Sequence, residues 1–169
     1  MNAALAAWNS SDEHAAQDAM LACCGARRWA AAMAALRPIA HEQELSEAAD
    51  HIWSTMEEAD WMEAFACHPR IGERETAHGN AKSAAWSRQE QSSANAAHEQ
   101  VLAELAAGNA QYEERFGFTY IVCATGKSAE EMLGILKRRL GSDRAAELRE
   151  AAEQQRQIMQ IRLRKWLVE

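Results

Sequence analysis

The sequence predicts an all-α protein, a bundle of about eight helices. Ala, Glu, Gln, Leu, Arg and Met dominate its 169 residues, proline occurs only twice, and β-branched residues are sparse. This balance favours helix over strand along nearly the whole chain. A domain of this length buries about 68–70% of the surface of its unfolded chain, which suffices for a core. No linker or repeat divides the sequence, so we expect a single domain over residues 1–169.

The first half of the chain contains three clear helical patterns. The first begins in "NSSDEHAAQDAMLACCG", where Ser10 or Ser11 can cap a helix. The segment "ARRWAAAMAALRP" predicts a short second helix that ends before Pro38. Residues 41–56 place apolar side chains at steps of three and four, and residues 57–66 add one or two turns. We expect these apolar faces to form much of the core.

The middle of the chain is less regular. Segment 74–85 has no apolar period and predicts a loop, followed by a helix that begins around Trp86. A further helix is expected after two serines, Ser92 and Ser93, and should end at Gly108. Asn109 would then cap a separate short helix in "NAQYEERFG".

The residue composition then changes from helix-favouring to β-favouring. The run "FTYIVCATGKS" is the one β-prone stretch of the sequence, and it has no obvious partner strand. It predicts an extended, largely buried segment near residues 118–124. Ser128 is a suitable N-cap for the next helix, and the same logic starts the last helix at Ser142 and continues it to about Leu167.

Composition excludes several classes of partner and cofactor. With 18 Lys and Arg against 25 Asp and Glu, the net charge of −7 would repel a phosphate backbone, so nucleic acid is not an expected partner. The six histidines are scattered, and the sequence has neither a metal-ligand spacing nor a glycine-rich phosphate loop. We therefore expect no metal and no cofactor.

The same survey predicts a cytoplasmic location. The four cysteines, two of them adjacent, have the character of reduced thiols rather than of a disulfide framework. The N-terminus lacks a basic region followed by an apolar core, and the longest uncharged apolar run, "WAAAMAAL", is far shorter than a membrane span. No membrane partner is expected.

Four places in the sequence are candidates for chemistry, and the first is "EAFACHPRIGE". Because proline disfavours the α conformation of the residue before it, the helix ending near Ala66 or Cys67 must break at His68. The imidazole would then project from a fixed, extended residue and could move a proton. Alternatively, Pro69 and Gly72 only shape a turn and His68 points into water.

The second candidate is "WSRQEQ", in which Ser87, Glu90 and Gln91 share one face of a helix. A hydroxyl, a carboxylate and an amide together offer donors and acceptors to a ligand rich in ureido groups, and the carboxylate can relay a proton. The alternative is an ordinary solvated face with Ser87 as the N-cap.

The third candidate is Arg162, which falls within or beside the apolar arc of the last helix. A guanidinium at such a position needs an anion or a set of acceptors, because burying it alone is costly. A structural salt bridge to an internal glutamate is the alternative to a ligand contact.

The fourth candidate is the backbone of the extended run. Its N–H and C=O groups have no helix ladder to satisfy them, so a polar ligand could bind them. The alternative is a buried connector that neighbouring loops satisfy. The residues concerned are Tyr120, Ile121, Val122, Cys123 and Ala124.

Together, "FACHPRIGE", "WSRQEQ", "YEERFGFTYIVCATGKSAEEML" and a final helix with "IRLRKWL" resemble the 2-oxo-4-hydroxy-4-carboxy-5-ureidoimidazoline (OHCU) decarboxylases of urate degradation. The resemblance implies the all-α fold of that family, a homodimer, and a carboxy-lyase that needs no metal or organic cofactor. It also implies the reaction, which releases CO2 from OHCU and protonates the product to (S)-allantoin.

The resemblance assigns roles to the candidate residues. His68 is similar to the family's catalytic acid or base, Glu90 to its partner in proton handling, and Arg162 to a residue that meets an anionic or carbonyl oxygen. The expected substrate-binding groups are the side chains of Pro69, Ser87 and Gln91 and the backbone of Tyr120, Ile121, Val122, Cys123 and Ala124.

Two other interpretations of the sequence compete with this one. The first is a non-enzymatic helical module whose Ala-rich faces bind a protein partner. The second keeps catalysis but changes the substrate to another ureido or hydantoin compound, as in cyclic amidohydrolases. The lack of metal-ligand spacing argues against the usual metal-assisted route of such enzymes.

Overall fold

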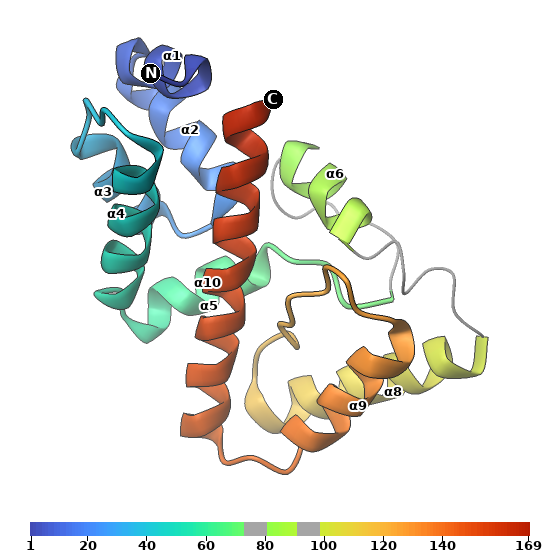
Figure 1. The fold of residues 1–169 in the computed structure, drawn as a ribbon. Helices are drawn as coiled ribbons and strands as arrows, with labels where there is room; N and C mark the ends of the chain where they lie inside the picture. The colour runs from blue at the N-terminus through green and yellow to red at the C-terminus, as the bar shows by residue number, and fades with distance from the viewer. Residues whose placement is uncertain (73–80, 91–98) are drawn as a thin grey trace. The chain divides into compact units, whose positions relative to one another are not determined.

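The computed structural model describes residues 1–72, 81–90 and 99–169, and every regular element in these ranges is a helix (Figure 1). The predicted all-α fold is therefore confirmed, with nine helices in the described ranges against about eight expected. They are α1 (Ala3–Ser10), α2 (Glu13–Cys23), α3 (Arg27–Ala35), α4 (Glu42–Ser54), α5 (Glu58–Ala66), α6 (Ala81–Glu90), α8 (Glu99–Phe116), α9 (Ala129–Arg139) and α10 (Arg144–Val168).

The chain forms two compact units. The first consists of residues 1–64 and 156–169, and the second of residues 65–155. The first unit packs α1 to α4 around tryptophans; for example, Trp29 is buried and donates from its indole Nε1 to the carbonyl oxygen of Ala49 at 3.1 Å. None of the described helices is both long and apolar enough to cross a membrane.

Two helices occupy the N-terminal region where one was expected. Asn2 caps α1, and Asp12 caps α2. The predicted cap at Ser10 or Ser11 was wrong, because Ser10 is the last residue of α1 and the Ser11 hydroxyl donates to the carbonyl oxygen of Trp8 at 2.8 Å. Both serines therefore close the first helix instead of opening the second.

Helix α6 begins at Ala81, five residues before the predicted start at Trp86. Alanine and lysine in residues 81–85 favour helix although they show no apolar period, so local propensity outweighs the missing pattern. Lys82 lies over the indole ring of Trp86, with its Nζ 5.3 Å from the ring centroid. The rest of the predicted loop, residues 74–80, lies outside the described residues, as do Ser92 and Ser93.

The predicted helix end at Gly108 was wrong, because α8 continues through it. Figure 1 shows α8 and α9 side by side. A Cβ at Gly108 would lie 2.6 Å from Cδ2 of Leu136 in α9, so the glycine permits the close approach of the two helices. Asn109 is not a cap, since its amide Nδ2 donates to the backbone carbonyl of Ile71 at 3.0 Å.

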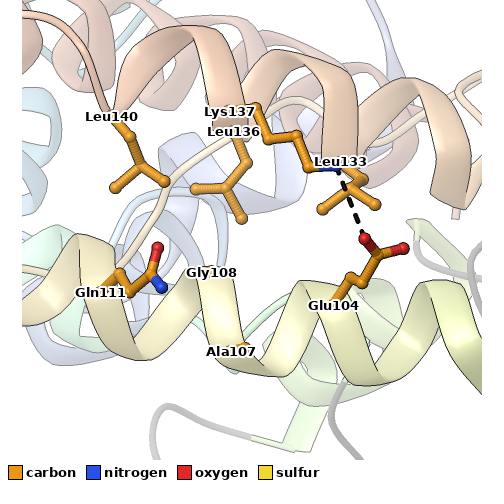
Figure 2. Close-up of a pocket in the computed structure, with 8 residues that line it drawn as sticks. All are labelled: Glu104, Ala107, Gly108, Gln111, Leu133, Leu136, Lys137 and Leu140. Atoms are coloured by element: carbon orange, nitrogen blue, oxygen red, sulfur yellow. Dashed lines mark ion pairs between the residues drawn. The ribbon is translucent and has the colours of Figure 1, made fainter.

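A small groove remains between these two helices (Figure 2). Its volume is about 190 Å³, and leucines of α9 face Ala107 and Gly108 of α8 across it. An ion pair between Lys137 Nζ and Glu104 Oε1, 3.6 Å apart, crosses one end of the groove. The leucines are Leu133 and Leu136 of α9 and Leu140 at its C-cap.

The C-terminal helices largely follow the sequence. Ser128 caps α9 as predicted and accepts from the backbone N–H of Glu131 at 3.1 Å. The start of α10 at Arg144 differs from the expected cap at Ser142, because the carboxylate of Asp143 accepts from the N–H of Ala146 at 2.8 Å. Residues 118–124 contain no helix or strand, which confirms the predicted extended segment.

Candidate active site

The turn that carries His68 is anchored by α8. Helix α5 ends at Ala66, as predicted, and His68 follows within two residues. Arg70 donates from Nε and Nη2 to the two carboxylate oxygens of Glu113, at 2.7 and 3.1 Å. Gly72 adopts a φ of +85°, a conformation that side chains other than glycine rarely take. The turn thus holds the imidazole in one place, as the His-Pro pair predicts.

The imidazole ring itself is held by Gln155. Nε2 of His68 lies 2.7 Å from the side-chain oxygen Oε1 of Gln155, a residue in α10 that is fully buried. A bond of this length between a half-buried ring and a fully buried amide restricts both the direction and the rotamer of the ring. His68 is therefore not a side chain that simply points into water.

Three side chains hold the extended segment through its backbone. Arg139 donates from Nη1 to the carbonyl oxygen of Ile121 at 2.6 Å. The N–H of Cys123 donates to Oε1 of Gln154 at 2.8 Å, and its carbonyl accepts from Nζ of Lys127 at 2.7 Å. The alternative of a connector satisfied by its surroundings is therefore correct for the carbonyl of Ile121 and for the backbone of Cys123.

Val122 differs from these neighbours. Its side chain is buried, and no group within the described ranges pairs with its backbone N–H or C=O. Buried backbone groups in folded proteins are nearly always paired with protein, water or ligand. Val122 therefore offers one donor and one acceptor in the middle of the predicted binding segment.

A buried charge cluster holds the Arg139 side chain that binds the carbonyl oxygen of Ile121. Arg139 donates from Nε to Glu147 at 2.6 Å, and Tyr112 donates its hydroxyl proton to the same carboxylate. Burial raises the pKa of Tyr112, and the bond to Glu147 raises it further, so the phenol stays protonated. Burial opposes the charge of Arg139, but its bond to Glu147 and the electrostatic attraction of Glu147, Tyr112 and Tyr120 together outweigh that effect and raise its pKa.

Two adjacent residues of α10 bring the predicted site elements together. Gln154 contacts the backbone of Cys123, and Gln155 contacts the ring of His68. One turn of α10 therefore ties down both the imidazole and the extended segment, which lie more than fifty positions apart in the sequence. The structure places these two predicted elements within reach of one another.

The second predicted cluster lies on α6. Ser87 is only 3% exposed, and it stands in the seventh position of a ten-residue helix, so it is neither an N-cap nor part of a solvated face. Glu90, the last residue of α6, is half-buried. Gln91 lies outside the described residues.

Arg162 is buried, as the helical projection predicts. Its side chain is 2% exposed, and Nη1 lies 3.4 Å from the carbonyl oxygen of Ala22, which accepts from it. Arg162 and Ala22 both belong to the first unit, whereas His68, Ser87, Glu90 and residues 120–124 belong to the second.

The sequence did not predict the side chains that position the site. Gln155 lies on the same face of α10 as Ala152 and Met159, three and four residues away. The projection that singled out Arg162 therefore contained a signal for Gln155 as well: a neutral polar residue on an apolar face. Lys127 and Arg139 carry no comparable signal for this role, because the contacts that they make with the extended segment are to backbone carbonyls, which any residue type provides.

The candidate groups supply acid–base and hydrogen-bonding chemistry. They comprise an imidazole, a carboxylate, a guanidinium, a hydroxyl and backbone amides, which can orient a polar ligand and move protons. Among the residues that the structure describes, no three His, Cys, Asp or Glu side chains are grouped so as to hold a metal ion. An all-helical fold with this equipment suits an acid–base enzyme acting on a small polar molecule.

Comparison with known proteins identifies one family. The family model described as OHCU decarboxylase matches residues 9–164. The chain therefore belongs to the OHCU decarboxylase family, as its motifs predict. A crystal structure of OHCU decarboxylase in the presence of (S)-allantoin is 34% identical, with a TM-score of 0.78 over 90% of this chain and 99% of that one.

Two curated relatives agree with this assignment. A 2-oxo-4-hydroxy-4-carboxy-5-ureidoimidazoline decarboxylase of Amia calva is 31% identical over 79% of this chain and 77% of its own length. The uric acid degradation bifunctional protein TTL of Arabidopsis thaliana is 35% identical over 88% of this chain. The match spans 46% of the length of the Arabidopsis protein.

Proposed function

We propose that this protein decarboxylates OHCU to (S)-allantoin and CO2 in the degradation of urate. Family membership and the related decarboxylase crystallised with (S)-allantoin support this substrate and product. The structural observation that carries the proposal is the pair of glutamines on α10, which hold the His68 ring and the Cys123 backbone at distances of 2.7 and 2.8 Å.

The substrate supplies its own electron sink, so the proposed reaction needs no cofactor. When the C–C bond to the carboxylate breaks, its electron pair passes into the adjacent C=N of the ring and CO2 leaves. The hydroxyl proton moves to the ring nitrogen as the hydroxyl-bearing carbon becomes a carbonyl, and protonation of the former C=N carbon on one face gives the S product. The protein has to orient the scissile bond, stabilise the charge that develops on the ring, and deliver one proton.

The candidate residues divide these tasks. His68 moves the proton, and Glu90 is its partner in proton handling. Arg162 meets an anionic or carbonyl oxygen of the substrate, where a buried guanidinium stabilises developing negative charge. These roles rest on the motifs that the residues occupy and on the burial of Arg162.

The binding groups orient the substrate around these three side chains. Pro69 lies against the substrate, and Ser87 and Gln91 bind its ureido and ring groups. The backbone from Tyr120 to Ala124 forms hydrogen bonds with the carbonyl and N–H groups of the substrate. Within that segment the backbone N–H and C=O of both Tyr120 and Val122 have no partner among the described residues, which supports these two residues as binding groups.

We further propose that the protein is a homodimer in the cytoplasm. The resemblance to the family supports the dimer, and the four free cysteines suit a reducing compartment. Light scattering coupled to gel filtration would test the dimer, and a mass equal to that of one chain would contradict it. Membership of a decarboxylase family gives no support to the alternative of a non-enzymatic interaction module.

The decisive experiment incubates the protein with freshly prepared OHCU. We expect CO2 release above the spontaneous rate and circular dichroism of the S enantiomer. A racemic product formed at the spontaneous rate would contradict the proposed function. The variant His68→Asn should lose enzyme-directed turnover, and normal formation of (S)-allantoin by this variant would contradict the assignment of the site.

A further inference from the structure

The contact between Gln155 and His68 uses only half of the glutamine amide. Oε1 lies 2.7 Å from Nε2 of His68, whereas Nε2 of Gln155 is buried and has no hydrogen-bond partner among the described residues. Gln155 as a whole is 0% exposed. A buried amide with an unpaired donor is costly, so its presence beside a proton-handling group asks for an explanation.

Because the N–H donor of Gln155 is unpaired among the described residues, its amide can make one hydrogen bond, to His68, in either of two orientations. The two ends of a glutamine amide have nearly the same shape, and a rotation of 180° exchanges Oε1 with Nε2. In this structure that rotation breaks only the bond to His68, and the rotated amide replaces it with an N–H donated to the same ring nitrogen. Neither orientation loses a second bond.

The two orientations suit the two states of the ring nitrogen. When Nε2 of His68 carries a proton, it donates to Oε1 of Gln155. When that nitrogen is unprotonated, it accepts from the rotated amide N–H. A carboxylate at this position could bind only the protonated nitrogen, because it accepts but does not donate. An apolar side chain could bind neither state of the nitrogen.

We propose that Gln155 is a positioning residue that holds the His68 ring in one place in both of its protonation states. The inference rests on the proposed function of His68 as the acid–base group. Without the rotation, the bond between the ring and Gln155 would be lost in one of the two protonation states. The rotating amide keeps the ring aimed at the substrate throughout, and a misplacement of about 1 Å can cost about a hundredfold in rate.

Two variants of Gln155 separate its roles. Gln155→Leu removes both the donor and the acceptor but keeps an apolar shape on the buried face of α10. Gln155→Glu keeps the acceptor and removes the donor. Gln111→Leu is the matched control, because it makes the same change at an exposed position of α8.

The first readout is steady-state kinetics with OHCU. We expect Gln155→Leu to lower kcat by about a hundredfold with KM changed only a few-fold, because orientation of the ring is lost and substrate contacts remain. Gln155→Glu should also lower kcat, since it anchors only the protonated nitrogen. Gln111→Leu should leave both constants unchanged.

The second readout is the ¹⁵N spectrum of the imidazole, which reports the protonation of each ring nitrogen without any turnover. Gln155→Glu should move the Nε2 resonance of His68 toward the protonated position, and Gln155→Leu should shift that resonance away from its wild-type position because the hydrogen bond is lost. Circular dichroism confirms folding, and Gln155→Met replaces the leucine variant if that variant does not fold.

The outcomes separate this inference from the proposed function. If wild-type protein fails to decarboxylate OHCU, the proposed function is wrong, while the ring spectra still test the anchor. If wild-type protein is active, His68→Asn is inactive and Gln155→Leu keeps normal kcat, the inference alone is overturned. A loss of kcat with unchanged ring resonances would make Gln155 purely structural and would overturn it equally.

Discussion

Arg139 donates from Nη1 to the carbonyl oxygen of Ile121 at 2.6 Å, and so a side chain of α9 fixes the backbone of the extended segment. The side chains of Arg139 and its partner Glu147 are 2% and 1% exposed. The guanidinium also lies over the ring of Tyr120, 4.9 Å from its centroid. One buried cation thus sets the position of the backbone that we propose reads the substrate.

Replacing Arg139 by methionine should lower the free energy of unfolding by about 3–5 kcal/mol, because it leaves the carboxylate of Glu147 buried without its cation. Urea denaturation measures the change. The exposed neighbour provides the control, and Arg138→Met should stay within about 0.5 kcal/mol of wild type. Equal stability of the two variants would show that the buried pair contributes nothing. Adding Glu147→Leu to Arg139→Met should recover part of the loss.

Two glycines in the paired helices α8 and α9 should respond to alanine in opposite ways. At Gly108 a new Cβ would lie 2.6 Å from Leu136 Cδ2, so the buried leucine must move, at a cost of about 1–3 kcal/mol. At Gly134 a Cβ meets nothing within 4 Å, so Gly134→Ala should stabilise the protein by about 0.5–1 kcal/mol. Thermal unfolding of both variants tests this, and stabilisation by Gly108→Ala would contradict the close packing in Figure 2.

The N-terminus of α3 should make stability depend on pH. Glu63 accepts from the backbone N–H of Arg27 at 2.6 Å and from its Nη2 at 2.9 Å. Burial tends to raise the pKa of Glu63, but these bonds outweigh it, so the pKa falls below its ordinary value of 4.5. A carboxyl with a depressed pKa stabilises the folded state above its unfolded pKa, and this contribution is lost as the pH falls through the folded pKa.

The variant Glu63→Gln should therefore be less stable than wild type at pH 7, and the difference should shrink as the pH falls below 4.5. Urea denaturation at a series of pH values measures it. Glu114→Gln, at an exposed position of α8, is the control and should show a smaller difference at pH 7. A difference for Glu63→Gln that grew in acid would contradict the sign of the shift.

Replacing Arg162 should lower turnover. Arg162→Met removes the proposed stabilisation of a substrate oxygen, and we expect kcat/KM to fall by about 10²–10³-fold. Thermal unfolding of the same variant measures the accompanying change in stability. Arg164→Met changes an exposed residue of the same helix and should leave kinetics intact. Equal kcat/KM for the two variants would remove Arg162 from the proposed machinery.

Helices were predictable where the signal is local. The composition indicated an all-α fold, the Ser128 cap follows from two residues three positions apart, and the break before His68 follows from one proline. Two of the errors occurred where a local signal had a tertiary partner. Gly108 does not end a helix because Leu136 packs against it, and Asn109 does not cap one because it binds the backbone of Ile71.

The sequence by itself determined the fold class, the family and the identity of the candidate groups, because these depend on residue types and short spacings. The tertiary structure alone decided how those groups are held. Gln155 reaches His68 across 87 positions, and Arg139 reaches Ile121 across 18. A hydrogen bond between distant residues leaves no spacing in the sequence, since its geometry exists only after the helices that carry its two ends have packed.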